Sequence, residues 1–180
     1  MEQIDGFSEA NPMLGLRGCR LAIKFPILPE MQVRAIATAA AQLKKEGLDP
    51  KPEIMIPLVS VVPELAKLRE LAEKIIAEVA EEQGVELEIP VGTMIELPRA
   101  AVTADEIATQ ADFFSFGTND LTQTTFGFSR DDVEAEFIPQ YLAERILPYN
   151  PFATVDPGVA KLVKMGVELG HQGNPDIVCG

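Results

Sequence analysis

Four short apolar runs, alternating with longer amphipathic segments, constrain the fold of this chain more than any other feature of its sequence. The runs begin at Glu53, Glu88, Asp112 and Asp176. Short apolar runs bounded by Gly, Pro or charged residues are typical of buried strands. Strands that alternate with helices predict repeated β/α units, which form a parallel sheet with helices outside it. Residues 18–23 are a further candidate for a fifth strand.

Three longer segments repeat their apolar residues at intervals of three and four, as amphipathic helices do. They are residues 28–46, 63–83 and 155–169, followed respectively by Gly47, Gly84 and Gly170. Thr103 and Glu106 have the spacing of a capping box, which predicts a short helix ending at Ala111. Residues 131–151 contain three prolines and are predicted to be irregular, with enough length for a covering loop.

The length of 180 residues limits how much of such a fold the chain contains. A (β/α)8 barrel, which carries its functional site at the carboxyl ends of its strands, takes about 250 residues. We therefore predict an α/β fold: a partial (β/α)8 TIM barrel with parallel strands and outer helices, in which the first and last units are missing. Residues 1–180 are predicted to be a fragment of one barrel domain.

The charge of the chain argues against several classes of partner. Lys and Arg number 15 against 28 Asp and Glu, a net charge of −13, which repels nucleic acid and anionic lipid. No apolar run approaches the roughly 20 residues needed to cross a bilayer. We predict a cytoplasmic protein with no nucleic-acid or membrane partner. Its Cys19 and Cys179 are expected to stay reduced and to form neither a disulfide nor a zinc site.

Polar groups crowd the end of the third apolar run. Gly117 ends the run, and Thr118, Asn119 and Asp120 follow it directly. Parallel α/β sheets bind ligands at the carboxyl ends of their strands. There Asp120 would suit a hard cation, and the backbone N–H groups from Gly117 onward would suit an anion. Arg130 adds a forked charge for phosphate. The alternative is that Asn119 and Asp120 only cap a helix.

Three other residues have both a functional and a purely structural interpretation. Arg17 lies among glycines that allow a ligand to approach the backbone, but a lone Arg beside Gly more often forms a surface ion pair. Glu96 ends the second run, where it either serves a ligand or pairs with a neighbour such as Arg99. Cys179 ends the fourth run, where the structural interpretation is a small, packed apolar side chain.

The residue order after Gly117 extends beyond what a helix cap requires. Gly-Thr-Asn-Asp-Leu-Thr-Gln followed by Arg130 resembles the signature of the enzymes that use phosphoenolpyruvate (PEP). This PEP-utilising family holds pyruvate phosphate dikinase, phosphoenolpyruvate synthase and enzyme I of the sugar phosphotransferase system. Residues 113–117, 125–132 and 11–20 are similar to the dikinase form, and residues 91–101 resemble the strand that gives the family a magnesium-binding Glu.

The resemblance implies the PEP- and pyruvate-binding barrel domain of such an enzyme, with Mg²⁺ as cofactor. It implies phosphoryl transfer between a phosphohistidine and pyruvate enolate. Substrate binding would fall to Arg17, Gly117, Thr118, Asn119 and Arg130, metal binding to Glu96 and Asp120, and proton transfer at the methylene carbon to Cys179.

The resemblance also implies partners that this sequence lacks. In the family the phosphohistidine and the ATP site lie on other domains, and the full enzyme is expected to be a homodimer, so this chain alone is expected to be inactive. Two alternatives stay open. One is a non-catalytic barrel remnant that needs a partner chain, because an incomplete barrel exposes sheet edges and apolar faces. The other is enzyme I of the sugar phosphotransferase system.

Overall fold

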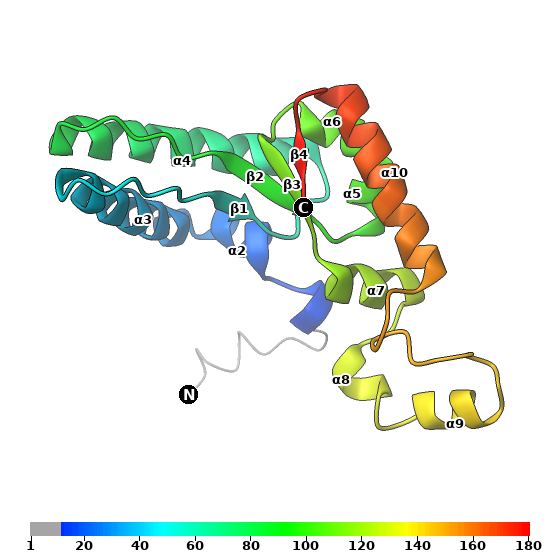
Figure 1. The fold of residues 1–180 in the computed structure, drawn as a ribbon. Coiled ribbons are helices and arrows are strands. Elements are labelled where there is room, and N and C mark those ends of the chain that lie inside the picture. The colour runs from blue at the N-terminus through cyan, green and yellow to red at the C-terminus, as the bar shows by residue number, and fades with distance from the viewer. Residues whose placement is uncertain (1–11) are drawn as a thin grey trace, which may run out of the picture.

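The computed structural model describes residues 12–180 as an α/β fold built on one sheet of four parallel strands (Figure 1). The strands are β1 (Ile54–Ile56), β2 (Val91–Ile95), β3 (Phe113–Phe116) and β4 (Val178–Cys179), and they lie side by side in that order. Each neighbouring pair is parallel. The four predicted strands and their parallel arrangement are therefore confirmed.

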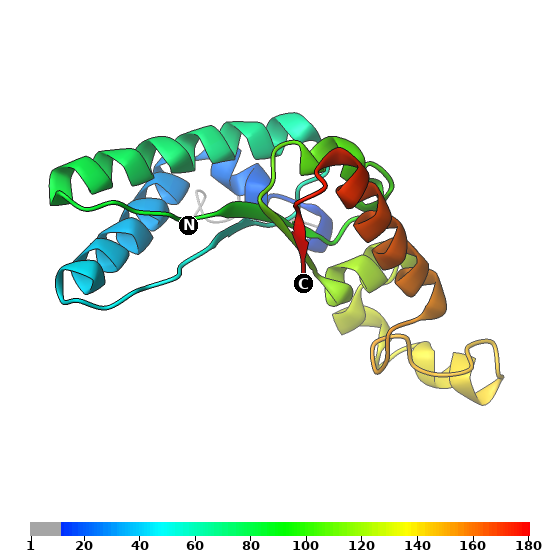
Figure 2. The same cartoon turned by 45° about the horizontal axis from the view of Figure 1, so that its top comes forward.

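Helices of very different length precede β1 and connect the strands. They are η1 (Pro12–Leu14), α2 (Gly18–Lys24), α3 (Ile27–Lys45), α4 (Val62–Gln83), α5 (Pro98–Val102), α6 (Ala104–Ala108), α7 (Thr118–Phe126), α8 (Arg130–Val133), α9 (Ile138–Ala143) and α10 (Pro157–Gly173). Figures 1 and 2 show α3 and α4 together at one end of the molecule, α10 beside α5 and α6, and α8 and α9 at the opposite extremity. Between residues 12 and 180, no helix combines the length and the hydrophobicity needed to cross a membrane.

One face of the sheet packs against the outer helices. The strand register aligns one row of side chains across the sheet: Ile56, Thr93, Phe114 and Cys179. Phe114 and Thr93 in this row are buried. Successive residues of a strand point to opposite faces, and on the other face Met55 and Val178 are 40% and 67% exposed. The sheet is therefore covered on its helix side and open on the other.

Two glycines let α10 approach the sheet closely. A Cβ atom at Gly170 would lie 2.8 Å from a ring carbon of Phe114, and one at Gly166 would lie 3.0 Å from a ring carbon of Phe116. Both aromatic side chains come from β3, the strand that leads into the polar segment. The absence of side chains at these positions thus fixes β3 against α10.

The strand predicted near the start of the chain is wrong, and the capping box predicted after β2 is only partly right. Residues 18–23 form α2 and not a strand, because a short apolar run fits a buried helix equally well, and α2 packs against α4. Thr103 is the N-cap residue of α6, as predicted, but it makes no capping bond. Its Oγ1 donates instead to the backbone oxygen of Arg99 in the preceding helix, at 2.9 Å. The short helix α6 also ends at Ala108, before the predicted Ala111.

Two predictions in the last third of the chain need correction as well. Residues 131–151 are not wholly irregular, since they contain most of α8 and all of α9. The helix predicted to stop at Gly170 continues to Gly173. Gly170 lies inside the helix because it faces the Phe114 ring, where a larger residue would not fit.

Candidate functional site

The polar residues predicted from the sequence gather at the carboxyl ends of β2 and β3. Glu96 directly follows β2. Gly117 follows β3 and is the N-cap residue of α7, whose first turn contains Asp120. Arg17 reaches the same edge from the start of the chain, as the residue with extended backbone that precedes α2. Because β2 and β3 are parallel, their ends bring Glu96 and Asp120 to the same edge of the sheet.

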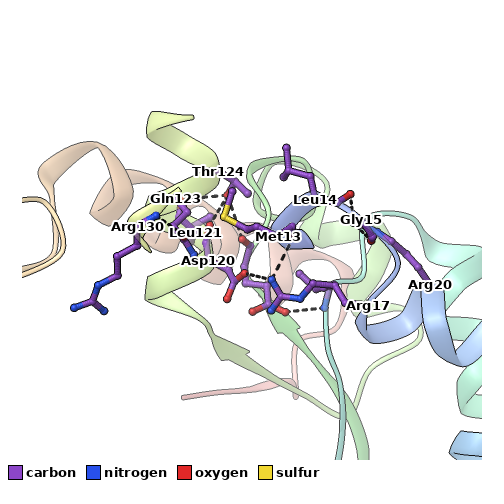
Figure 3. A network of polar contacts seen from close by, with 12 residues as sticks. Met13, Leu14, Gly15, Arg17, Arg20, Asp120, Leu121, Gln123, Thr124 and Arg130 are labelled. Atoms are coloured by element: carbon purple, nitrogen blue, oxygen red, sulfur yellow. Dashed lines mark hydrogen bonds and ion pairs between the residues drawn. The ribbon is translucent and has the colours of Figure 1, made fainter. Parts of the chain in front are cut away.

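Arg17 and Asp120 form an ion pair. Nη1 of Arg17 donates to Oδ1 of Asp120 at 2.9 Å and to the backbone oxygen of Met13 at 3.4 Å (Figure 3). The side chains are 41% and 19% exposed, so solvent screens the pair and its contribution to stability is at most about 1 kcal/mol. The pair is thus accessible to a ligand that competes for either partner.

Glu96 is a buried carboxylate held by a backbone donor. It is 3% exposed, and its Oε1 accepts a hydrogen bond from the N–H of Leu58 at 2.7 Å. Burial raises the pKa of Glu96 above the ordinary glutamate value; the Leu58 bond and the charge of Arg17 lower it, while the charge of Asp120 raises it. The two carboxylates are therefore close enough to repel one another, with a guanidinium nearby.

Leu58 adopts an unusual conformation to present that N–H. Its φ of 59° lies in the left-handed region, which costs a residue other than Gly about 1–2 kcal/mol. Cys19 supports the turn, since its Sγ donates to the Leu58 oxygen at 3.2 Å and its N–H donates to the oxygen of Pro57 at 3.1 Å. No residue pattern predicts this arrangement, because the donor to Glu96 is a main-chain group.

Gly117 leaves the space that Glu96 occupies. A Cβ atom at Gly117 would lie 2.5 Å from Sδ of Met94, 2.7 Å from Oε2 of Glu96 and 2.8 Å from Cβ of Glu96. The N–H of Gly117 donates to the backbone oxygen of Ile95 at 3.2 Å, so it does not point into an anion site as predicted. Gly117, and not the predicted alternative of Asn119 or Asp120, occupies the N-cap position of α7.

The first-turn N–H groups of α7, beginning with Thr118, have no acceptor within the helix, as at any helix start. They therefore keep the anion-binding capacity predicted for this segment.

Arg130 and Asn119 form a second group beside the first. Nη1 of Arg130 donates to Oδ1 of Asn119 at 3.2 Å, and the backbone N–H of Arg130 donates to Oε1 of Gln123 at 2.8 Å. Figure 3 shows Arg17 directed at Asp120, whereas the side chain of Arg130 extends away from it. The structure thus places Arg17, Glu96 and Asp120 together, and Asn119 and Arg130 together.

Cys179 lies apart from both groups. It is the register partner of Phe114 and packs against the hydrophobic core on the helix side of the sheet. Burial raises the pKa of its thiol, so the thiol is protonated at neutral pH. No hydrogen bond joins Cys179 to Glu96 or Asp120 in the described part of the chain. Its catalytic role stays a prediction.

The donor set at the sheet edge suits a hard cation that keeps some of its waters. Residues 12–180 contain no group of three or more His, Cys, Asp or Glu side chains that could hold a metal ion by themselves. Glu96 and Asp120 supply oxygen ligands only, and Mg²⁺ is commonly bound by one or two carboxylates with the rest of its shell from water and substrate. Arg99 does not pair with Glu96 as the alternative expected; it donates to the backbone oxygen of Ser60.

Comparisons with known proteins agree with the sequence signature. The family described as "PEP-utilising enzyme, PEP-binding domain" matches residues 1–180. Chloroplastic pyruvate, phosphate dikinases of Flaveria bidentis and Arabidopsis thaliana are 53% identical over 182 residues and 51% over 184. These alignments cover 99% and 100% of this chain and 19% of each relative. The chain therefore spans about a fifth of the length of these relatives.

A solved structure supports the fold. A citrate lyase of Burkholderia xenovorans LB400 superposes with a TM-score of 0.53 and 20% identity, covering 83% of this chain and 39% of that one. At this identity the likeness concerns the fold alone. It agrees with the predicted partial barrel of parallel strands and outer helices.

The comparisons correct one prediction and confirm another. The prediction of a cytoplasmic protein is wrong by this evidence, because the relatives from Flaveria bidentis and Arabidopsis thaliana are named chloroplastic. An acidic composition without a long apolar run does not distinguish one aqueous compartment from another. The resemblance to the dikinases is confirmed at about 50% identity along the whole chain. This chain belongs to the PEP-utilising enzymes and matches part of their PEP-binding domain as found in pyruvate phosphate dikinases.

Proposed function

We propose that this chain is the PEP- and pyruvate-binding part of a pyruvate phosphate dikinase. In the full enzyme, ATP, pyruvate and phosphate would give AMP, PEP and diphosphate, with the phosphoryl group passing between a phosphohistidine and pyruvate enolate. The observation that carries this proposal is the Arg17–Asp120 ion pair beside the buried Glu96 at one edge of the sheet. A divalent cation held by the two carboxylates, with the guanidinium beside it, would match a substrate with a carboxylate, an oxyanion and a phosphoryl group.

Glu96 and Asp120 would hold Mg²⁺ in this proposal. Their mutual repulsion, which contributes to the raised pKa of Glu96, is the kind of interaction that a divalent cation relieves. When bound, Mg²⁺ supplies positive charge that stabilises negative charge on the enolate oxygen. The Leu58 N–H fixes one oxygen of Glu96, so this carboxylate is oriented before any ligand arrives.

The arginines and the start of α7 would bind the phosphoryl group. Arg17 and Arg130 present planar, forked donors, which suit phosphate oxygens. Asn119 contacts Arg130 and would orient the same group by hydrogen bonding, next to the free N–H groups of the first turn, including that of Thr118. Arg17 would exchange part of its contact with Asp120 for the substrate.

Cys179 would handle the proton at the methylene carbon of the substrate. Its thiol carries a proton at neutral pH, because burial raises its pKa. A protonated thiol can deliver that proton to the carbon as PEP is converted to pyruvate. This role requires the methylene carbon of the ligand to reach Cys179 in β4, while the other end of the ligand is held by the residues after β2 and β3.

The phosphohistidine and the ATP site would lie in the rest of a longer protein. This chain matches only about a fifth of the length of the dikinases, so the chain alone is proposed to bind substrate without turnover. The full enzyme is proposed to be a homodimer.

Calorimetry with oxalate, a stable mimic of pyruvate enolate, tests the proposal on the 180-residue chain. We expect heat of binding with Mg²⁺ and none without it. Glu96→Ala and Asp120→Ala should abolish that heat while circular dichroism shows a folded chain. Glu88→Gln and Asp176→Asn are matched controls, because these exposed carboxylates lie before β2 and β4, at the far ends of the strands. Oxalate binding that ignores Mg²⁺ or survives both alanine variants would refute the proposal.

A second candidate is a non-catalytic barrel remnant that needs a partner chain. The exposed Met55 and Val178 on the open face of the sheet favour it. Sedimentation of the chain, together with the oxalate titration, separates the two: a folded chain that self-associates and binds no oxalate supports the remnant.

A further inference from the structure

Arg130 belongs to a closed ring of four contacts that no sequence motif indicated. Its Nε donates to Oε2 of Glu134 at 3.3 Å. The other oxygen of Glu134, Oε1, accepts from Nδ2 of Asn150 at 3.3 Å. Oδ1 of Asn150 accepts from the backbone N–H of Phe152 at 2.9 Å. The ring of Phe152 lies under the Arg130 guanidinium, 5.6 Å from its centre, and so returns to the starting residue.

The helix explains only one of these contacts. Arg130 and Glu134 are four residues apart at α8, a spacing that pairs side chains on any helix surface. Asn150 is different, because it comes from the segment after α9 and joins Glu134 across sixteen residues. Its own side chain also shapes the turn that carries Phe152. Asn150 thus links both groups that touch the guanidinium, one at its edge and one at its face.

The four contacts together determine the orientation of the Arg130 side chain. Each contact alone is weak, since the Arg130 and Glu134 side chains are 40% and 37% exposed. Together, the Glu134 contact at Nε and the Phe152 side chain against the guanidinium face fix both the direction and the plane of the guanidinium. In that plane Nη1 reaches Oδ1 of Asn119 at 3.2 Å. A guanidinium held in this way loses less conformational entropy when it binds an anion than a guanidinium without such contacts.

We propose that Glu134 and Asn150 are positioning residues that hold the Arg130 guanidinium beside Asn119, ready for the phosphoryl group of PEP. The part of this proposal that names PEP rests on the function proposed above; the part that concerns Arg130 does not. The segment between α8 and Phe152 then has a definite role. It supports the substrate site through Asn150.

Nuclear magnetic resonance of the Arg130 Nε–H tests the positioning directly. The resonance is assigned by its loss in Arg130→Lys. In the unmodified chain we expect this proton to exchange with water more slowly than the Nε–H of an arginine without partners. Asn150→Ala should bring exchange about 1.5- to 5-fold closer to that of a free arginine, since one partly exposed polar contact to Glu134 is lost. Glu134→Gln, which keeps the side-chain shape, should act in the same direction.

A titration with PEP in the presence of Mg²⁺ tests the use of the positioned arginine. Asn150→Ala changes no charge, so a PEP affinity about threefold to fivefold lower would report the loss of orientation. Gln140→Ala is the matched control, because Gln140 is an exposed amide of the same segment that pairs with Glu144 and lies outside the ring. Its Arg130 exchange rate and PEP affinity should equal those of the unmodified chain.

The outcomes separate this proposal from the proposed function. Unchanged Arg130 exchange in both Asn150→Ala and Glu134→Gln, with folding retained, overturns the positioning role whatever the chain binds. Changed exchange with unchanged PEP affinity overturns the link to the substrate. If the unmodified chain binds no PEP, the proposed function fails; faster Arg130 exchange in the two variants would still establish the positioning role.

Discussion

Replacement of Gly117 by Ala should damage the fold and the proposed Mg²⁺ site together, because Gly117 makes room for Glu96. The added methyl group would lie 2.5–2.8 Å from Met94 and Glu96 atoms, where carbon contacts are normally at about 3.5–4.0 Å. The Met94 sulfur can move, but Cβ of Glu96 cannot move without its backbone. Overpacking of this kind costs about 1–3 kcal/mol.

The backbone of Gly117 does not contribute to that cost. Its φ of −81° is ordinary for alanine, so the whole effect should come from the clash. Gly84→Ala is the matched control, since Gly84 ends α4 with a φ of 65° and has no atom within 4 Å of an added Cβ. It should lose about 1–2 kcal/mol from backbone strain alone and leave Mg²⁺ binding unchanged.

Urea unfolding and an Mg²⁺ titration with oxalate measure the two effects. Gly117→Ala should lower the free energy of unfolding by about 1–3 kcal/mol. By displacing Glu96 it should also weaken Mg²⁺ binding about 10- to 100-fold, as changes around metal ligands do. A Gly117→Ala chain with normal stability and normal Mg²⁺ affinity would show that the space beside Glu96 is not used as described.

Three further predictions follow from the site. Because burial raises the pKa of Glu96, the folded chain binds this proton more strongly than the unfolded chain, so metal-free stability should fall as the pH rises from the usual glutamate pKa toward the raised value. Glu96→Gln should flatten that part of the profile of melting temperature against pH. An unchanged profile in the variant would contradict the prediction. Arg17→Lys should change the free energy of unfolding by less than about 1 kcal/mol, because its ion pair is partly exposed, yet weaken PEP binding measured by calorimetry. Iodoacetamide at pH 7 should alkylate Cys179 more slowly than a free thiol, because burial raises its pKa. Cys19, whose pKa is raised to about 12, should stay unmodified until the chain unfolds. Mass spectrometry of the labelled peptides measures both rates, and labelling of Cys19 in the folded chain would contradict the prediction.

The sequence predicted helices better than it predicted their buried faces. Residues 28–46 were expected to be helical and form α3. Within it Ala37 and Ala41 are fully buried, whereas Met31 is 61% and Leu43 38% exposed. Periodicity shows that a helix has an apolar stripe, but the distance to the neighbouring helix decides which side chains are covered. The small alanines allow α3 to lie close against α4.

The site was predictable where it depends on strand ends and motif residues. Glu96 and Asp120 follow neighbouring parallel strands, so their meeting was implied by the β/α order. Asn150 and Glu134 were not predicted, because their contact depends on the path of the chain between them. No local pattern in the sequence records that path.

The left-handed turn at Leu58 has a consequence for the evolution of the site. The donor to Glu96 is a peptide N–H, so every amino acid except proline supplies it. A substitution at position 58 therefore alters the backbone strain and the core packing of the buried Leu58 side chain, but it keeps the donor. A mutational scan of side chains would therefore pass over this hydrogen bond. Chemical synthesis with an ester in place of that single amide would expose its importance to the carboxylate.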